Sequence, residues 1–166
     1  MKTGIALGSN LGDRAVRMAA ARDFIFALHE GSPPPLVSGL YETEPVGCVA
    51  GTAAFFNAVI EIETSLAPHD LLRKLRNHEL ASGRAEKRAK NSPREIDLDL
   101  LYVDDLRVDS AVLVLPHPRM TSRRFVLQPL SDIRADLILP GQRSSVAQLL
   151  SEFPAAPAAR LVTTKW

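Results

Sequence analysis

Residues 55–63 read Phe55-Phe56-Asn57-Ala58-Val59-Ile60-Glu61-Ile62-Glu63, an alternation that is typical of a β-strand. Successive side chains of a strand point to opposite faces of the sheet. One face of this strand therefore carries the apolar set Phe56, Ala58, Ile60 and Ile62. The other face carries the mixed set Phe55, Asn57, Val59 and Glu61. We predict a strand whose apolar face lies against the core.

The neighbouring segments predict the order strand, helix, strand, strand, helix, strand. Their expected bounds are 4–7, 13–29, 36–41, 55–63, 68–83 and 96–103. In the first helix, the residues expected to be buried are Val16, Ala20, Phe24 and Leu28, which recur every four positions. Residues 125–130 and 146–151 are also predicted to be helical, and the Ala/Pro-rich tail to be a connection. This order is typical of a ferredoxin-like α+β fold, an antiparallel sheet with helices on one face, whose other face is free for a ligand.

Composition predicts one domain over residues 1–166, with 46% hydrophobic and 23% charged residues. A net charge of +1 creates no global field for nucleic acid or a lipid surface. No apolar run approaches the roughly 20 residues that span a bilayer, and the start of the chain does not resemble a signal peptide. The single cysteine, Cys48, excludes an internal disulfide and fits a reducing compartment. We therefore expect a cytoplasmic protein without nucleic-acid or membrane partners.

The sharpest chemical signal is the segment Glu95-Ile96-Asp97-Leu98-Asp99-Leu100-Leu101. On a strand, Asp97 and Asp99 project together while the apolar residues between them point into the core. Two adjacent carboxylates repel each other unless a cation lies between them. Mg²⁺ suits such a site, because it takes one or two carboxylates together with phosphate oxygens. The alternative is a pair of aspartates that only solubilise the wet face of the strand.

A basic segment leads directly into this strand. Its cations are Arg84, Lys87, Arg88, Lys90 and Arg94. Basic residues beside a carboxylate pair indicate a site for magnesium and a polyphosphate. An ordinary solvated loop and a nucleic-acid patch are alternatives, although the segment has no aromatic residue on which bases could stack. The sequence has no Walker-type motif, so any ATP phosphates are held without a P-loop.

Phe55 and Asn57 share the mixed face of their strand. A ring beside a carboxamide can stack on a flat heterocycle and hydrogen-bond its edge. Alternatively, Phe55 covers a second small core and Asn57 only begins the strand.

Two more polar residues occupy unusual positions. Glu79 lies near the buried stripe of the second helix, where a carboxylate needs a partner, and Arg84 and Arg94 are candidates. Alternatively, Glu79 is an ordinary exposed residue on the surface of the helix. His117 has a proline on both sides, which suits either a phosphate contact or a rigid turn.

The order and spacing of several segments resemble the 6-hydroxymethyl-7,8-dihydropterin pyrophosphokinase family over nearly the whole chain. These segments are Leu7-Gly8-Ser9-Asn10-Leu11-Gly12-Asp13, Tyr41-Glu42-Thr43-Glu44-Pro45-Val46-Gly47, Phe55-Phe56-Asn57-Ala58-Val59, Pro93-Arg94-Glu95-Ile96-Asp97-Leu98-Asp99 and Leu115-Pro116-His117-Pro118-Arg119-Met120, with residues 78–84 and 123–130. The resemblance implies an ATP- and magnesium-dependent transfer of pyrophosphate to a hydroxymethyl pterin, with AMP as the leaving group. It implies a monomer whose partners are ATP and the pterin.

The resemblance also implies residue roles. Asp97 and Asp99 would bind two Mg²⁺ ions, and together with Arg84 and Arg94 they would be the catalytic residues. The expected pterin contacts are Phe55 and Phe125 on its two faces, Asn57 and the backbone from Thr43 to Val46 at its amide-like edge, and Arg123 close by. The expected nucleotide contacts are Arg84, Lys87, Arg94 and His117, with Glu79 supporting the site from behind.

Three departures from the family pattern leave other functions open. Asn91-Ser92 stands where many relatives carry Trp-Gly, and Pro118 replaces a frequent aromatic residue. Glu95 stands where a small hydroxyl residue is common, and its charge is expected to affect the nearby metal pair. The alternatives are a paralogue that acts on a related pterin, a non-catalytic ferredoxin-like binding module and an RNA-binding domain.

Overall fold

The computed structural model describes residues 1–45, 51–83, 95–154 and 159–166. The strands are β1 (Lys2–Ser9), β2 (Leu36–Val37), β3 (Leu40–Thr43), β4 (Phe55–Glu63), β5 (Asp97–Val103), β6 (Val108–Asp109), β7 (Val114–Leu115) and β8 (Arg160–Thr163). The helices are α1 (Arg14–Phe26), α2 (Pro68–Ala81), α3 (Arg124–Arg134) and α4 (Val146–Ser151), with a short 3-10 turn, η1 (Met120–Ser122).

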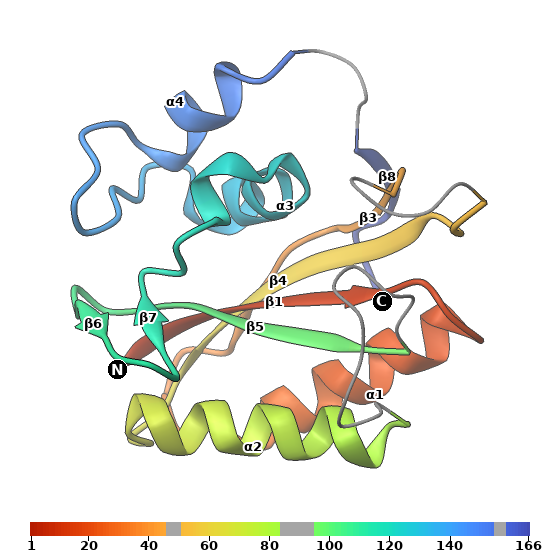
Figure 1. Cartoon of the computed structure of the whole chain (residues 1–166), viewed down its shortest axis with the longest axis horizontal. Helices are drawn as coiled ribbons and strands as arrows, with labels where there is room; N and C mark the ends of the chain where they lie inside the picture. Colours follow the sequence, from red (N-terminus) through yellow and green to blue (C-terminus); the bar gives the residue numbers. More distant parts are fainter. Residues whose placement is uncertain (46–50, 84–94, 155–158) are drawn as a thin grey trace.

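The main sheet is antiparallel and has the order β5-β1-β4-β3-β8, with β2 also paired to β4. The helices α1 and α2 lie under one face, and α3 and α4 lie over the other (Figure 1). The predicted ferredoxin-like fold is confirmed. The second face is less open than expected, because α3 and α4 cover part of it. Among the described helices, none is long and apolar enough to cross a membrane.

The larger core lies between the sheet and the lower helices. Alternate residues of the strands, such as Ile60 of β4 and Leu98 of β5, pack there with Met18, Ala21 and Ile25 of α1. The predicted buried stripe of α1 was half right: Phe24 and Leu28 pack against this core, whereas Ala20 is exposed and Val16 is 61% exposed. A four-residue repeat drifts about 40° around the helix at each step, because four residues exceed the 3.6 of one turn.

A second core lies between the other face of the sheet and the upper helices. Its members include Val59, Leu101 and Tyr102 from the strands and Leu127 and Leu130 from α3. Both C-terminal helices were predicted. The strand that follows the Ala/Pro-rich segment 153–159 was not predicted: β8 pairs with β3 and adds an edge strand to the sheet.

Candidate active site

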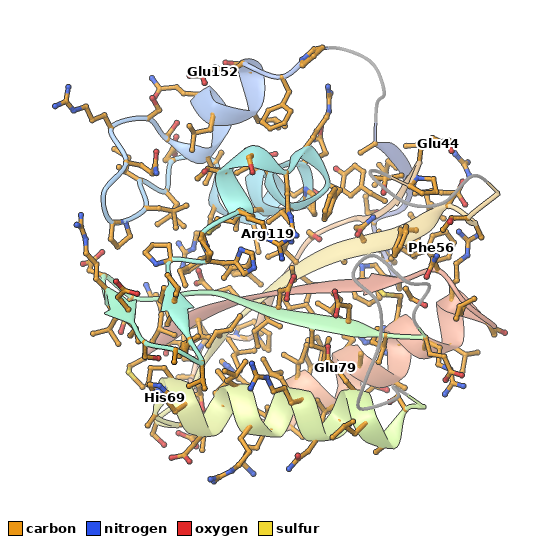
Figure 2. All side chains as sticks on the ribbon, in the orientation of Figure 1. Glu44, Phe56, His69, Glu79, Arg119 and Glu152 are labelled. Carbon is orange, nitrogen blue, oxygen red and sulfur yellow. The ribbon has the colours of Figure 1, made fainter. Side chains whose placement is uncertain are left out.

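The two aspartates of β5 lie side by side on the second face of the sheet. Asp97 and Asp99 are half-buried, whereas Leu98 between them is buried in the larger core, as the alternation predicted. Glu79 is only 2% exposed, and its Oε1 accepts a hydrogen bond of 2.7 Å from the backbone N–H of Leu98. Figure 2 shows Glu79 between α2 and the sheet. A carboxylate of α2 therefore holds the edge strand at the residue between the two aspartates.

Small residues of the central strand form the floor of the site. Gly8 of β1 lies opposite Asn57 of β4 on one side and opposite Asp97 of β5 on the other. Ala6, two residues earlier on the same face, lies opposite Asp99. Neighbouring strands are about 4.8 Å apart, so Asn57 and Asp97 are separated by about 10 Å across a strand that carries no bulky side chain there. We call this feature the trough.

The wall of the trough on the β4 side is polar and fixed. The side-chain amide of Asn57 donates a hydrogen bond of 2.7 Å to the hydroxyl of Thr43. Thr43 lies opposite Phe55 in the pairing of β3 with β4, and Tyr41 lies opposite Asn57. The sequence therefore identified residues that lie together on the β3–β4 side of the trough.

Arg14 of α1 supports this wall from below. Its guanidinium lies 3.9 Å from the ring centroid of Phe56, pairs with Glu42 at 3.0 Å and donates to the carbonyl of Ala54 at 2.7 Å. The hydrogen bond from Arg160 is the main cause that holds the pKa of Glu42 below its ordinary value; burial opposes it, and the hydrogen bond from Arg14 adds to the lowering. Arg14 thus ties together the end of β3 and the start of β4. Sequence reasoning missed this contact because its partners are distant in the chain.

Polar groups from the segment around α3 reach the aspartates from above. The Nη1 of Arg123 lies 3.4 Å from Oδ2 of Asp99, and its guanidinium lies 5.5 Å from the ring centroid of Phe125. His117 accepts a hydrogen bond of 3.1 Å at Nδ1 from the N–H of Arg119, so the neutral ring carries its proton on Nε2. Burial lowers the pKa of His117, although Asp99 acts in the opposite direction, so the neutral ring is favoured.

A cavity of about 300 Å³ opens along the outer edge of β5. It is lined by α2, by β5 and by the β6–β7 hairpin, with Asp99 and His117 at one side and Leu72 and Arg76 at another. Arg76 also donates a hydrogen bond of 3.4 Å to the carbonyl of Val112 in the hairpin. The sequence had identified Asp99 and His117 and had predicted short extended segments at 106–108 and 112–115, but it gave no signal that Arg76 lines this cavity.

The expected effect of Glu95 on the aspartate pair needs correction. Its carboxylate pairs with Arg17 of α1 at 2.7 Å, on the helix side of the sheet. The Ser9 hydroxyl donates to the Glu95 carbonyl at 2.5 Å and fixes this turn at the start of β5. The charge of Glu95 is therefore compensated by Arg17. Four predicted site residues lie outside the described residues: Val46, Arg84, Lys87 and Arg94.

Comparison of the sequence with known protein families gives a match that spans the segments that form the trough, the aspartate pair and the edge cavity. The model of the 7,8-dihydro-6-hydroxymethylpterin-pyrophosphokinase (HPPK) family matches residues 4–135. This chain belongs to the HPPK family. The match covers most of the chain, including β1, β4, β5 and the start of α3, from which the site is built.

Relatives of similar length support the HPPK assignment. The chain is 40% identical over 131 residues to a Bacillus subtilis 2-amino-4-hydroxy-6-hydroxymethyldihydropteridine pyrophosphokinase, covering 78% of this chain and 75% of the relative. It is 39% identical over 150 residues to the protein of the same name from Pseudomonas aeruginosa, covering 90% of each.

Solved structures agree on the fold. A crystal structure of Plasmodium falciparum HPPK-DHPS with pteroate matches with a TM-score of 0.67 over 90% of this chain, at 14% identity. The chain spans 42% of that protein, so it matches less than half of the larger one.

Proposed function

We propose that this HPPK uses the trough and the adjoining cavity to transfer the pyrophosphoryl group of ATP to the hydroxymethyl oxygen of 6-hydroxymethyl-7,8-dihydropterin, as a pyrophosphokinase of folate biosynthesis. The observation that carries the proposal is the row Asn57, Gly8 and Asp97 across three neighbouring strands. The side-chain amide of Asn57 can hydrogen-bond the edge of a pterin, and the carboxylate of Asp97 lies about 10 Å away, on the phosphate side. Gly8 between them has no side chain, so this spacing leaves room for a flat bicyclic ring with a reactive arm.

The pterin lies over Gly8 in this arrangement. Asn57, held by Thr43, hydrogen-bonds its amide-like edge. The contribution of the backbone from Thr43 to Val46 rests on the sequence pattern alone. Phe55 and Phe125 stack on its two faces, because aromatic rings pack well on flat heterocycles. The hydroxymethyl arm then points across β1 toward the two aspartates.

The nucleotide lies on the other side of β5. Its base and ribose enter the edge cavity, and its phosphates pass Asp99 and His117 at the mouth of that cavity. The Nε2–H of neutral His117 donates to a phosphate oxygen. Arg84, Lys87 and Arg94 contact the phosphates, and this part of the proposal rests on the sequence pattern alone.

The two aspartates fit magnesium. They offer hard oxygen ligands on one face of β5. This donor set suits Mg²⁺, which keeps positions for phosphate oxygens and water. Asp97 and Asp99 would hold two such ions, which supply charge neutralisation to the phosphates when bound.

The reaction is an in-line displacement at the β-phosphorus of ATP. A bond forms between the hydroxymethyl oxygen and the β-phosphorus, and the bond from that phosphorus to the α,β-bridging oxygen breaks. The bridging oxygen leaves with the electron pair as part of AMP, and the hydroxyl proton passes to solvent. The chain contributes orientation, because the trough fixes the pterin and the cavity fixes the nucleotide.

Residues 1–166 act as one domain in this proposal. The single cysteine fits a reducing compartment such as the cytoplasm. The proposal of a monomer rests on the family resemblance alone.

The test is AMP release from ATP and Mg²⁺, with and without 6-hydroxymethyl-7,8-dihydropterin. We expect AMP only when the pterin is present, and a fall of about 100-fold or more for Asp97→Asn. Asp105→Asn, in the exposed turn after β5, is the matched control and should keep wild-type activity. Pterin-independent AMP release, or full activity of folded Asp97→Asn, would contradict the proposal. Turnover only with another hydroxymethyl pterin would favour the paralogue.

A further inference from the structure

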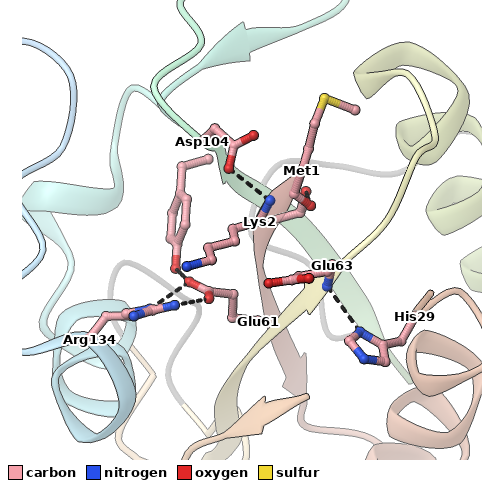
Figure 3. Close-up of polar contacts among 9 residues, drawn as sticks. Met1, Lys2, His29, Glu61, Glu63, Asp104 and Arg134 are labelled. Atoms are coloured by element: carbon pink, nitrogen blue, oxygen red, sulfur yellow. Dashed lines mark hydrogen bonds and ion pairs between the residues drawn. The ribbon is translucent and has the colours of Figure 1, made fainter. Parts of the chain in front are cut away.

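A polar cluster beneath α3 lies outside the site described above. Glu61 of β4 is 6% exposed and accepts hydrogen bonds from the Tyr102 hydroxyl at 2.6 Å and from Nε of Arg134 at 2.9 Å. A second nitrogen of Arg134 pairs with the other oxygen of Glu61 (Figure 3). Burial acts to raise the pKa of Glu61, but the hydrogen bonds from Arg134 and Tyr102 outweigh it and hold that pKa below its ordinary value. We call these three residues the anchor cluster.

Two features of the sheet aim Tyr102 at Glu61. The register of β5 against β1 shifts between Gly4 and Ile5, and this irregularity places Tyr102 opposite Gly4. Gly4 also lies opposite Glu61, so Tyr102 reaches Glu61 across β1. A Cβ atom on Gly4 would lie 2.2 Å from the Tyr102 ring, so only glycine leaves room for this crossing. Such irregularities often re-aim a side chain.

A second contact fixes the same end of α3 to another strand. Asp132 accepts hydrogen bonds from the Tyr41 hydroxyl at 2.9 and 3.0 Å and from the N–H of Gly39 at 3.0 Å. Tyr41 in turn lies opposite Asn57. The C-terminal part of α3 is thus held at two points, one on β4 and one at the start of β3.

The other end of α3 carries Phe125 and follows directly on Arg123. The link of this end to the aspartates is the weaker contact of 3.4 Å between Arg123 and Asp99. A helix rises about 1.5 Å per residue, so Phe125 lies about 13 Å from Arg134 along the axis. A tilt of about 4° at the anchored end would therefore move Phe125 by about 1 Å, a displacement that matters for positioning a substrate.

We propose that Glu61 and Arg134 are positioning residues for the pterin: their directional ion pair sets the angle of α3 and so the place of Phe125 over the trough. This inference rests on the proposed function, because it takes Phe125 as a pterin contact. Apolar packing between α3 and the sheet is non-directional and permits small tilts and slides. A bidentate ion pair selects one geometry.

The test separates positioning from stability. Arg134→Met leaves Glu61 buried without its cation, so this single variant is expected to be less stable. The triple variant Glu61→Leu/Tyr102→Phe/Arg134→Met replaces the whole cluster with apolar groups, which usually restores stability. Arg134→Lys keeps the positive charge but cannot make the two parallel hydrogen bonds of the guanidinium to Glu61. Arg73→Met, which removes the exposed pair of Arg73 with Asp70 on α2, is the matched control.

The KM for the pterin, the KM for ATP and the melting temperature are measured for each variant. We expect the folded triple variant to raise the KM for the pterin about tenfold and to change the KM for ATP less than about twofold. Arg134→Lys should lie between this variant and wild type. A folded triple variant with wild-type KM for the pterin, or an equal rise in both constants, overturns the inference. A wild-type enzyme without pterin-dependent turnover overturns the proposed function and the inference with it.

Discussion

Replacing Glu79 tests whether α2 holds the edge strand that carries the aspartates. Its buried carboxylate accepts a 2.7 Å hydrogen bond from the N–H of Leu98. A hydrogen bond to a charged group contributes about 1.5–3 kcal/mol, and its loss leaves that N–H without this acceptor. We expect Glu79→Ala to lower the free energy of unfolding by about 2 kcal/mol and the melting temperature by about 4–8 °C. Glu79→Gln keeps an acceptor oxygen and should cost about 1 kcal/mol.

Urea unfolding measures this difference directly. Trp166 is the single tryptophan of the chain, and its indole N–H donates to the Ser38 carbonyl at 3.0 Å, so its fluorescence reports the folded state. Asn77→Ala, on the exposed side of the same helix, is the control and should change stability by less than about 0.5 kcal/mol. A Glu79→Ala variant within about 0.5 kcal/mol of wild type would show that this hydrogen bond does not stabilise β5.

Three further predictions concern the trough, the sheet and the pH dependence of stability. Gly8→Leu should fold yet raise the KM for the pterin more than about tenfold, because its side chain would fill the floor of the trough; an unchanged KM would place the pterin elsewhere. Gly4→Ala should lower the free energy of unfolding by about 2 kcal/mol, since its Cβ would meet the Tyr102 ring at 2.2 Å, whereas Gly8→Ala meets Asn57 at an ordinary 3.5 Å and should cost much less; equal losses would contradict this account. Burial lowers the pKa of His78 from 6.5, so the stability that the neutral ring contributes is complete above that pH and is lost as the pH falls below it. His78→Phe, which keeps the stacking on Phe24, should therefore lose less stability than wild type between about pH 7 and pH 5, and an equal loss in urea titrations would rule out this contribution.

Local alternation was enough to predict the two strands that carry the site. A strand has a period of two residues, so the faces of β4 and β5 could be assigned from the sequence, and the structure agrees at Asn57 and Asp97. The faces of α1 were harder to assign, because its sequence offers two apolar patterns. The one that packs includes Met18 and Ile25, and tertiary contacts make that choice.

The missed features depend on residues that are distant in the chain. Arg14 reaches Glu42 and Ala54, and the anchor cluster joins β4, β5 and α3; no local pattern indicates these contacts. The trough, by contrast, is indicated by a local sequence pattern in β1. Gly4, Ala6 and Gly8 alternate as small residues along β1, which indicates a strand whose one face leaves room for something else.

The products of the reaction show which bond of ATP is broken and which group is transferred. Phosphorus NMR of a mixture of wild-type protein, ATP, Mg²⁺ and 6-hydroxymethyl-7,8-dihydropterin distinguishes the possible transfers. We predict AMP and a diphosphate ester of the pterin in equal amounts, since the bond between the α-phosphorus and β-phosphorus groups is the one that breaks. ADP with a monophosphate ester, or AMP with free pyrophosphate and unchanged pterin, would contradict the account.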